Sequence, residues 1–475
     1  MAATLGNYVA WSSTGSLASL LKEWYLGPVQ NQLNQEVMAL QLFEKATVDW
    51  NGRLCMIPIH TGRNVSTQFL GEGENFFPGG AAGPAGQQEW KHLTVRAHFL
   101  YGHFQISGPA IASAKAGGKG AFIGWMEAEM TRLVEDVKNL ADQTLVSGGS
   151  CVGFLHACTA PGAPAIWGFD GDYGKLSAAI TAGMTSVAIG RMDQPGFLSD
   201  GVTAANTYFL DQVSAAILVT GGLVGLNETA GTLALGNVNT TTSGGAAPPV
   251  NAGGFGFPVY LTDVGALQAT ASNNQPRGIF ANFSERSPFG VDKGGANATP
   301  VPPLLTATPA LQPIVLTCDP NPTAAPTVQR APLSAERMQQ VFDEVSVLSG
   351  KDPDIILCHP TMRAQYVALM ADTGNLYTDT RGAATKGDAG FLDLSFANVP
   401  LKYGRHIPRG MMVYLETKTW KIAELQSGAF ADLDGSALHR TGTTDEWNGY
   451  YRWYYNLVCT QPNANAILCG INYPT

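Results

Sequence analysis

The sequence is poor in charge and has no surplus of basic residues. Only 14% of its 475 residues are charged, and 28 Lys and Arg stand against 37 Asp and Glu, which gives a net charge of −9. Proteins that grip nucleic acid neutralise its phosphates with clustered Lys and Arg. The composition therefore excludes a protein that works by holding nucleic acid on a basic surface.

Paired cysteines and long apolar runs are also missing. The seven cysteines are scattered from Cys55 to Cys469 with no CxxC pair. That pattern predicts reduced, mostly buried thiols rather than a disulfide framework or a zinc site. The first basic residue is Lys22, and the longest apolar stretch, residues 215–226, is too short to span a bilayer. We expect a soluble, cytoplasmic chain that binds no metal and no cofactor.

Catalytic motifs are absent too. The segment AKAGGKGAF resembles a phosphate loop, but Lys119 is followed by Gly120 where that motif needs Ser or Thr. Asp432 and Asp434 lack the later ligands of a calcium loop. No GxSxG or HExxH pattern occurs. We therefore predict no catalytic residue and no enzymatic activity.

Aromatic residues gather near the end of the chain, and two interpretations stay open for them. They could stack on bases or sugars, or they could pack within a β-strand. Only Arg452 is basic there, beside Asp445 and Glu446, so strand packing is favoured. The cluster consists of Trp447, Tyr450, Tyr451, Trp453, Tyr454 and Tyr455.

Residues 53–106 predict a long antiparallel hairpin whose Gly- and Pro-rich crossing runs from residue 71 to 86. On its return strand the alternation places Val95, Ala97, Phe99 and Tyr101 on one face, with Arg96 and His98 on the other. A ribbon of about ten residues per strand would project some 30 Å and is marginally stable alone. Something outside the hairpin must cover it.

Helical periodicity marks three further segments. One precedes Trp50, where apolar residues recur behind Pro28. The second runs from Gly120 to Val146 and stops at a Gly pair. The third begins after Ser334, which we predict to be its N-cap, and opens a helix, strand, helix and two-strand unit. Residues 221–332 are rich in Gly, Ala, Thr, Asn and Pro and predict an irregular β-rich insertion.

The order of these segments resembles the major capsid proteins of tailed double-stranded DNA phages, the Hong Kong 97 type fold. FLGEGENFFP is similar to that family's extended loop, and EWKHLTVRAHFLYGHFQISG to its return strand. GWMEAEMTRLVEDVKNLADQTLVSGG resembles the long spine helix, and DPDIILCHPTMRAQYVALMADTGNLY the axial-domain strand, turn and helix.

The resemblance implies an α+β chain in six parts. These are an N-terminal arm and helix (1–50), the extended loop hairpin (51–106), the spine helix and peripheral domain (107–220), the β-rich insertion (221–332), the axial domain (333–425) and C-terminal return strands (426–475).

As function, the resemblance implies a structural subunit that assembles with itself into hexamers and pentamers of an icosahedral shell around double-stranded DNA, without sequence-specific contact and without a membrane. Its location would be the virion, after assembly in the host cytoplasm. Other implied partners are a portal, a separate scaffolding protein and, in some relatives, a decoration or cement protein. Intersubunit contacts are expected on the arm, at Glu72, Glu74, Phe76, Phe77, Trp90 and Arg96.

The chain departs from the founding member of that family in two ways. Residues 74–89 contain no Lys, whereas that loop carries a Lys that joins covalently to an Asn on a neighbour, so we predict a non-covalent shell. The segment between spine and axial domain is also longer. An encapsulin-like protein compartment is the first alternative, and a β-rich carbohydrate-binding protein or hydrolase that uses the C-terminal aromatics is the second.

Overall fold

The computed structural model describes residues 37–47, 50–62, 72, 88–109, 119–149, 151–158, 165–181, 186–189, 219–227, 232–240, 257–261, 275–284, 313–318, 330–372, 394–431, 438–440 and 445–473. Internal contacts divide the chain into Met1–Gln35 and Glu36–Thr475. The first unit, with most of the helix predicted behind Pro28, lies outside the described residues.

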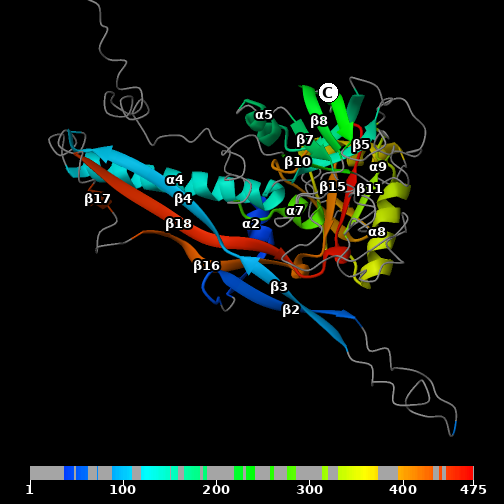
Figure 1. Cartoon of the computed structure of the whole chain (residues 1–475), viewed down its shortest axis with the longest axis horizontal. Helices are drawn as coiled ribbons and strands as arrows, with labels where there is room; N and C mark the ends of the chain where they lie inside the picture. The colour runs from blue at the N-terminus through cyan, green and yellow to red at the C-terminus, as the bar shows by residue number, and fades with distance from the viewer. Residues whose placement is uncertain are drawn as a thin grey trace, which may run out of the picture. The chain divides into compact units, whose positions relative to one another are not determined.

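Both helices and strands are present, as the α+β prediction requires (Figure 1). The helices are α2 (Met38–Leu42), α4 (Lys119–Ser147), α5 (Tyr173–Thr181), α7 (Ile279–Ser284), α8 (Ala335–Ser349) and α9 (Pro360–Asp372), with 3₁₀ turns η5 (Thr417–Thr419) and η6 (Pro462–Ala464). The strands are β1 (Glu44–Thr47), β2 (Leu54–Gly62), β3 (Glu89–Arg96), β4 (His98–Ser107), β5 (Cys151–Cys158), β6 (Ala165–Gly171), β7 (Ser186–Ile189), β8 (Val219–Asn227), β9 (Thr232–Thr240), β10 (Phe257–Leu261), β11 (Ile314–Thr317), β12 (Ile355–Cys358), β13 (Leu394–Phe396), β14 (Val399–Tyr403), β15 (Met412–Leu415), β16 (Trp420–Phe430), β17 (Leu438–Arg440), β18 (Glu446–Cys459) and β19 (Ala466–Cys469).

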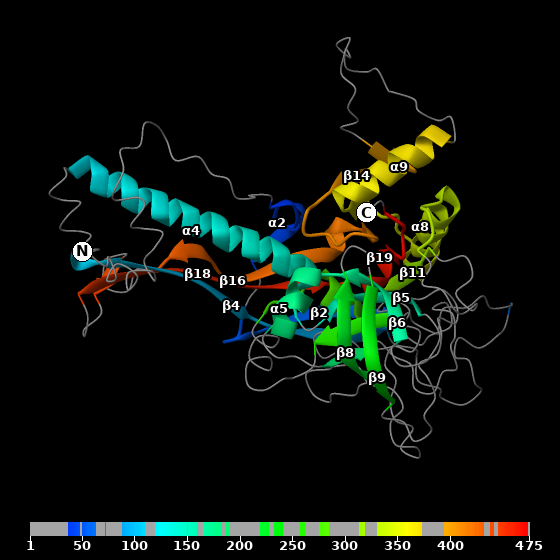
Figure 2. The same cartoon turned by 90° about the horizontal axis from the view of Figure 1, so that it is seen from above.

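A five-stranded sheet is built around β18, which pairs antiparallel with β16, β17 and β4, while β1 pairs in parallel with β16. Helix α4 runs along this sheet in both views (Figures 1 and 2). Gly102 of β4 allows the close approach, because a Cβ there would lie 2.8 Å from the side chain of Val137. The predicted long helix and its glycine stop are confirmed, since Gly149 follows α4 with a φ of 77°.

The segment predicted as one return strand consists of two strands in different sheets. β3 pairs with β2, whereas β4 pairs with β18. Ala97 lies between them, and the alternation of buried and exposed side chains changes there. Val95 and Ala97 are buried, whereas after Ala97 it is His98 that is buried, and Phe99 and Tyr101 are exposed. The single shared face predicted for this segment is therefore wrong beyond Ala97, because a side-chain period of two reverses when one residue leaves the strand.

The predicted boundary at residue 220 falls inside a closed barrel of order β10-β5-β6-β9-β8-β7. Strands from both sides of that boundary pair, for example β6 with β9. Two further pieces of the predicted insertion lie elsewhere, since α7 packs into the main core and β11 pairs with β19. The described parts of residues 221–332 thus do not form a separate unit, because closure of the barrel requires strands from both segments to cover each other's edges. β10 and β11 are strands within this range, as its β-rich prediction requires.

A six-stranded sheet of order β11-β19-β15-β12-β14-β13 carries the predicted helix, strand, helix and two strands. The hydroxyl of Ser334 accepts the Arg337 N–H at 3.2 Å, which confirms the N-cap of α8, and Gly350 ends that helix in the left-handed region. The second of the two strands predicted at the end of this unit, MMVYLETKTWKIAE (residues 411–424), is divided by η5. β15 therefore lies in this sheet and β16 in the five-stranded one.

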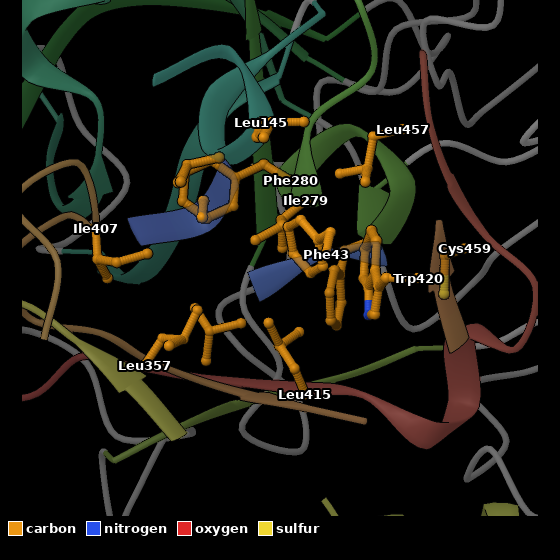
Figure 3. Packing of buried hydrophobic residues seen from close by; sticks show 14 of the residues in the cluster. Phe43, Leu145, Ile279, Phe280, Leu357, Ile407, Leu415, Trp420, Leu457 and Cys459 are labelled. Atoms are coloured by element: carbon orange, nitrogen blue, oxygen red, sulfur yellow. The ribbon is translucent and has the colours of Figure 1, made fainter. Parts of the chain in front are cut away.

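The main core joins the two sheets and three helices (Figure 3). Trp420, at the start of β16, is the largest fully buried side chain of the described residues, and its ring lies 5.5 Å from that of Phe43 and 6.3 Å from that of Phe283. Its indole N–H donates to Asn465 Oδ1 at 2.8 Å. The buried polar atom of the indole is thereby satisfied, which makes this ring a fixed point between the sheets.

A buried ion pair joins the barrel to the six-stranded sheet. Arg330 donates from Nη2 to Asp170 Oδ1 at 2.7 Å, and the N–H of Gly470 donates to Asp170 Oδ2 at 2.7 Å. Burial raises the pKa of Asp170 to about 7, against the opposing effects of Arg330 and the Gly470 N–H. The guanidinium of Arg330 also lies 4.1 Å from the ring centre of Tyr473. The C-terminal segment is thereby tied to barrel strand β6.

Candidate intersubunit surfaces

The β2–β3 hairpin is anchored at its base by one face only. Its inward residues Cys55, Ile59, Leu93 and Val95 pack on Ala423 of β16 and Val458 of β18. The amide of Asn456 adds a hydrogen bond to the Arg96 carbonyl at 2.8 Å. An isolated hairpin is marginally stable and needs a covered face. This small cluster covers the inward face of the β2–β3 hairpin and leaves the other face uncovered.

The opposite face of the hairpin is largely uncovered. Antiparallel register places Leu54 opposite Arg96, Met56 opposite Thr94, Pro58 opposite His92 and His60 opposite Trp90. Met56 is 67% exposed and Trp90 58% exposed, and the rings of Trp90 and His60 lie 5.0 Å apart. We call these eight residues the hairpin outer face.

The contact residues predicted on the arm divide into three groups. Trp90 and Arg96 are exposed and share the hairpin outer face. No carboxylate of the described residues forms an ion pair with Arg96. Glu72 is an exposed turn residue. Glu74, Phe76 and Phe77 lie outside the described residues, so their contacts stay predictions.

A second, partly exposed surface lies on the five-stranded sheet, on the side away from α4. We call it the sheet outer face; it consists of Phe99, Tyr101 and His103 of β4 with Tyr450, Arg452 and Tyr454 of β18. Alternation puts these side chains on one side of the pleat, opposite Tyr451, Trp453 and Tyr455.

The rings of the sheet outer face contact one another across the two strands. Phe99 and Tyr454 meet edge-to-face at 4.8 Å, and His103 stacks on Tyr450 at 5.1 Å. The hydroxyls of Tyr101 and Tyr454 lie 2.9 Å apart. The pKa of Tyr101 is raised, mainly by this hydrogen bond and to a smaller extent by burial. The face is thus a preorganised aromatic surface held by cross-strand pairs.

The two surfaces lie on the same side of the sheet. Val458, which the hairpin covers, is an even-numbered residue of β18, as are Tyr450 and Tyr454, and the pairing of β18 with β4 has no bulge. The guanidinium of Arg53, at the foot of the hairpin, lies 5.8 Å from the ring centre of Phe99. The hairpin base and the aromatic face are therefore neighbours on one surface.

The C-terminal aromatic cluster is divided between the core and this surface. Tyr451, Trp453 and Tyr455 are buried, and the Tyr455 hydroxyl lies 3.1 Å from the Thr144 hydroxyl of α4. Strand packing, the favoured interpretation, is confirmed for these three. The sequence did not reveal that Phe99 and Tyr101, some 350 residues earlier in the chain, complete the exposed half. Strict alternation within both strands was the available signal.

The part of the chain that the structure describes contains no group of three His, Cys, Asp or Glu side chains placed to hold a metal ion. Six cysteines are free and buried, as predicted. None of the described helices is both long and apolar enough to cross a membrane.

Comparisons with known proteins give structural likeness only. No family model matches the chain, and no curated protein matches it. The capsid asymmetric unit of Cyanophage A-1(L) is 12% identical, with a TM-score of 0.48 over 95% of this chain and 98% of that one. The capsid of a native GTA particle is 8% identical, with a TM-score of 0.46 over 97% and 99%. An encapsulin complex from Synechococcus elongatus is 16% identical, with a TM-score of 0.23 over 34% and 55%.

The first two of these proteins are described as capsids, the class of protein that the sequence itself resembles. Every one of these TM-scores is below 0.5, so none of these structures assigns a function to the chain.

Proposed function

We propose that the chain is a major capsid subunit of a tailed phage, with a Hong Kong 97 type fold. In this assignment α4 is the spine helix, the β2–β3 hairpin is the base of the extended loop, and the sheet that carries α8 and α9 is the axial domain. The barrel is an elaboration between spine and axial domain.

The observation that carries the proposal is the outward side of the β2–β3 hairpin. The hairpin packs on the rest of the chain through one face only, and Met56 and Trp90 are exposed on the other face. Soluble monomeric proteins rarely expose a contiguous apolar surface of this kind. The aromatic sheet outer face continues that surface at the foot of the hairpin. Contact with neighbouring copies would cover both.

Self-assembly into hexamers and pentamers would repeat these contacts around a closed icosahedral shell. Repetition lets individually modest interfaces add up to a durable container. The absence of Lys from residues 74–89 supports a shell held without the covalent bond of the founding family member. A separate scaffolding protein, a portal and a decoration or cement protein are the further partners proposed.

The shell would enclose double-stranded DNA without binding its phosphates tightly. The net charge of −9 is compatible with a wall that does not bind phosphates tightly, because tight binding would hinder packing and release. The proposed location is the virion, and the proposed role is structural and non-enzymatic.

Assembly with its scaffolding protein tests the proposal. The wild-type chain should form closed icosahedral shells in negative-stain images and sediment as large particles. Met56→Asp combined with Trp90→Ala should leave the far-UV circular dichroism of the subunit unchanged, because both side chains are exposed, and should abolish shells. Met56→Leu keeps an apolar side chain at the same position and should assemble.

Two results would contradict the proposal. One is a wild-type chain that stays monomeric with and without the scaffolding protein. The other is normal shell formation by the double variant.

A further inference from the structure

A polar pocket of about 260 Å³ lies apart from both outer faces. It is lined by α4 through Gln143, by the start of α5, by His359 just before α9, and by the loop between β14 and β15. That loop contributes Arg405, His406 and Arg409. Cationic and hydrogen-bonding side chains from elements far apart in the sequence therefore meet around one small cavity.

His359 offers the pocket a fixed hydrogen-bond donor. Its Nδ1 accepts the N–H of Thr361 at 3.2 Å in the first turn of α9, so the proton of the neutral ring is on Nε2. Burial, and then the charge of Arg409, lower the pKa of His359 to about 4. The ring is neutral at neutral pH, and Nε2–H is its remaining donor.

Arg409 brings the positive charge. It is exposed at the pocket, and no carboxylate of the described residues forms an ion pair with it. Arg405 lies on the same loop and is also exposed. A guanidinium presents its donors as a planar fork that matches carboxylate and phosphate oxygens. The amino end of α9, at His359, adds partial positive charge.

The acidic residue that lines the pocket is already occupied by donors. Asp172 Oδ1 accepts the Lys175 N–H at 2.9 Å, and Oδ2 accepts the Ser147 hydroxyl at 2.8 Å and the Gln143 amide at 3.3 Å. These bonds hold the carboxylate against α4 and α5 and partly compensate its charge.

His406 is held in a similar way on the α4 side. Its Nε2 lies 3.0 Å from Asn139 Oδ1 and 3.9 Å from Asp142 Oδ2. Burial lowers the pKa of His406, against the effect of Asp172. The positive charge considered for a ligand is thus that of Arg409.

We propose that this pocket binds a small oxyanion of the phosphate or carboxylate type, with the Arg409 guanidinium and His359 Nε2–H as its principal donors. The volume of about 260 Å³ lies below the roughly 300–1,000 Å³ of pockets that hold drug-sized ligands, which favours a small anion over a nucleotide. Such an oxyanion has two sources: a free ion, or an acidic side chain of a neighbouring copy.

Inorganic phosphate is the probe for the test. The unassembled full-length chain is titrated with phosphate at constant ionic strength, with chloride as the reference salt, and followed by ³¹P NMR and by the unfolding temperature. Wild type should bind saturably. Arg409→Gln should bind about tenfold or more weakly, as loss of a charge-assisted bond predicts. Lys402→Gln removes the same charge from an exposed position that does not line the pocket and should match wild type.

Repeating the titration on assembled particles separates the two sources. Binding that persists after assembly supports a free anion, and binding that is lost supports a neighbour's carboxylate in the pocket. The proposal is overturned if phosphate acts on the unassembled wild type only as chloride does, or if Arg409→Gln binds as tightly as wild type. Neither result depends on whether the chain forms shells.

Discussion

Asp170 and Arg330 form a buried ion pair with a separation of 2.7 Å, although 160 residues separate them in the chain. The Asp170 side chain is fully buried and that of Arg330 is 9% exposed. Asp170 also accepts the Gly470 N–H, and the Arg330 guanidinium lies over the Tyr473 ring. The pair therefore joins barrel strand β6, the segment just before α8 and the C-terminal segment.

Removing one member of this pair should be severe. Arg330→Met leaves the Asp170 carboxylate buried without its cation, which predicts a loss of about 3–5 kcal/mol in the free energy of unfolding. Arg132→Met provides the control, because Arg132 and Glu135 form a partly exposed pair one turn apart on α4, and such pairs contribute about 0–1 kcal/mol. Denaturant unfolding followed by tryptophan fluorescence measures both. Equal losses for the two variants would refute the role of the buried pair.

Gly410 and Gly350 offer a matched test of the same region. Both have positive φ, at 80° and 69°. A Cβ on Gly410 would collide with the Asp170 carboxylate, whereas nothing lies within 4 Å of one on Gly350. Gly350→Ala should cost about 1 kcal/mol of backbone strain. Gly410→Ala should cost about 2–4 kcal/mol more because it displaces the ion pair. Thermal and denaturant unfolding of the two variants would show a similar loss if the collision were absent.

His359 should give a characteristic pH dependence of stability. Its pKa is lowered from 6.5 to about 4 in the folded chain. The unfolded state therefore binds more protons between those values, so this group's contribution to stability is complete above about pH 6.5 and is lost as the pH falls toward 4. His359→Asn keeps a side chain that can hold the first turn of α9. The difference between the wild-type and variant unfolding free energies should change across that window, and a constant difference would contradict the assignment.

Tyr454 tests the sheet outer face. Tyr454→Phe removes the hydrogen bond to Tyr101 but keeps the ring contacts, so subunit stability should change by about 0–1 kcal/mol and assembly should persist. Tyr454→Lys places a charge on the same surface and should block assembly with the subunit still folded. Sedimentation velocity and circular dichroism together separate these outcomes. Normal assembly of the Lys variant would exclude this face from the interface.

Local rules predicted those parts of the fold that are specified within a few residues. The run of α4 to its glycine stop, and the Ser334 cap and Gly350 end of α8, follow from spacing and capping. Pairing over long distances could not be predicted in this way. Residues on both sides of Ala97 alternate regularly, yet β3 and β4 pair in different sheets. In the same way, η5 separates β15 from β16, which lie in different sheets. In both cases the edges of strands distant in the sequence decide where the chain leaves one sheet for another.

The candidate surfaces also combine features that nearby residues specify with features that depend on long-range strand pairing. Trp90 and Arg96 could be placed on the arm from the sequence, since alternation fixes which side of a strand is outward. The sheet outer face could not, because it arises only when β4 pairs with β18. The polar pocket was missed for a similar reason: His359 and Arg409 carry no motif, and the parallel pairing of β12 with β14 brings their loops together.

The central claim is that another copy of the chain covers the hairpin outer face. Replacing Trp90 by a photoreactive phenylalanine, and assembling shells from a mixture of ¹⁴N- and ¹⁵N-labelled subunits, tests it directly by mass spectrometry of the cross-linked peptides. We predict mixed-label pairs in the proportion expected for random mixing. Cross-links confined to peptides of the same label would show that position 90 contacts only its own chain, and would contradict the claim.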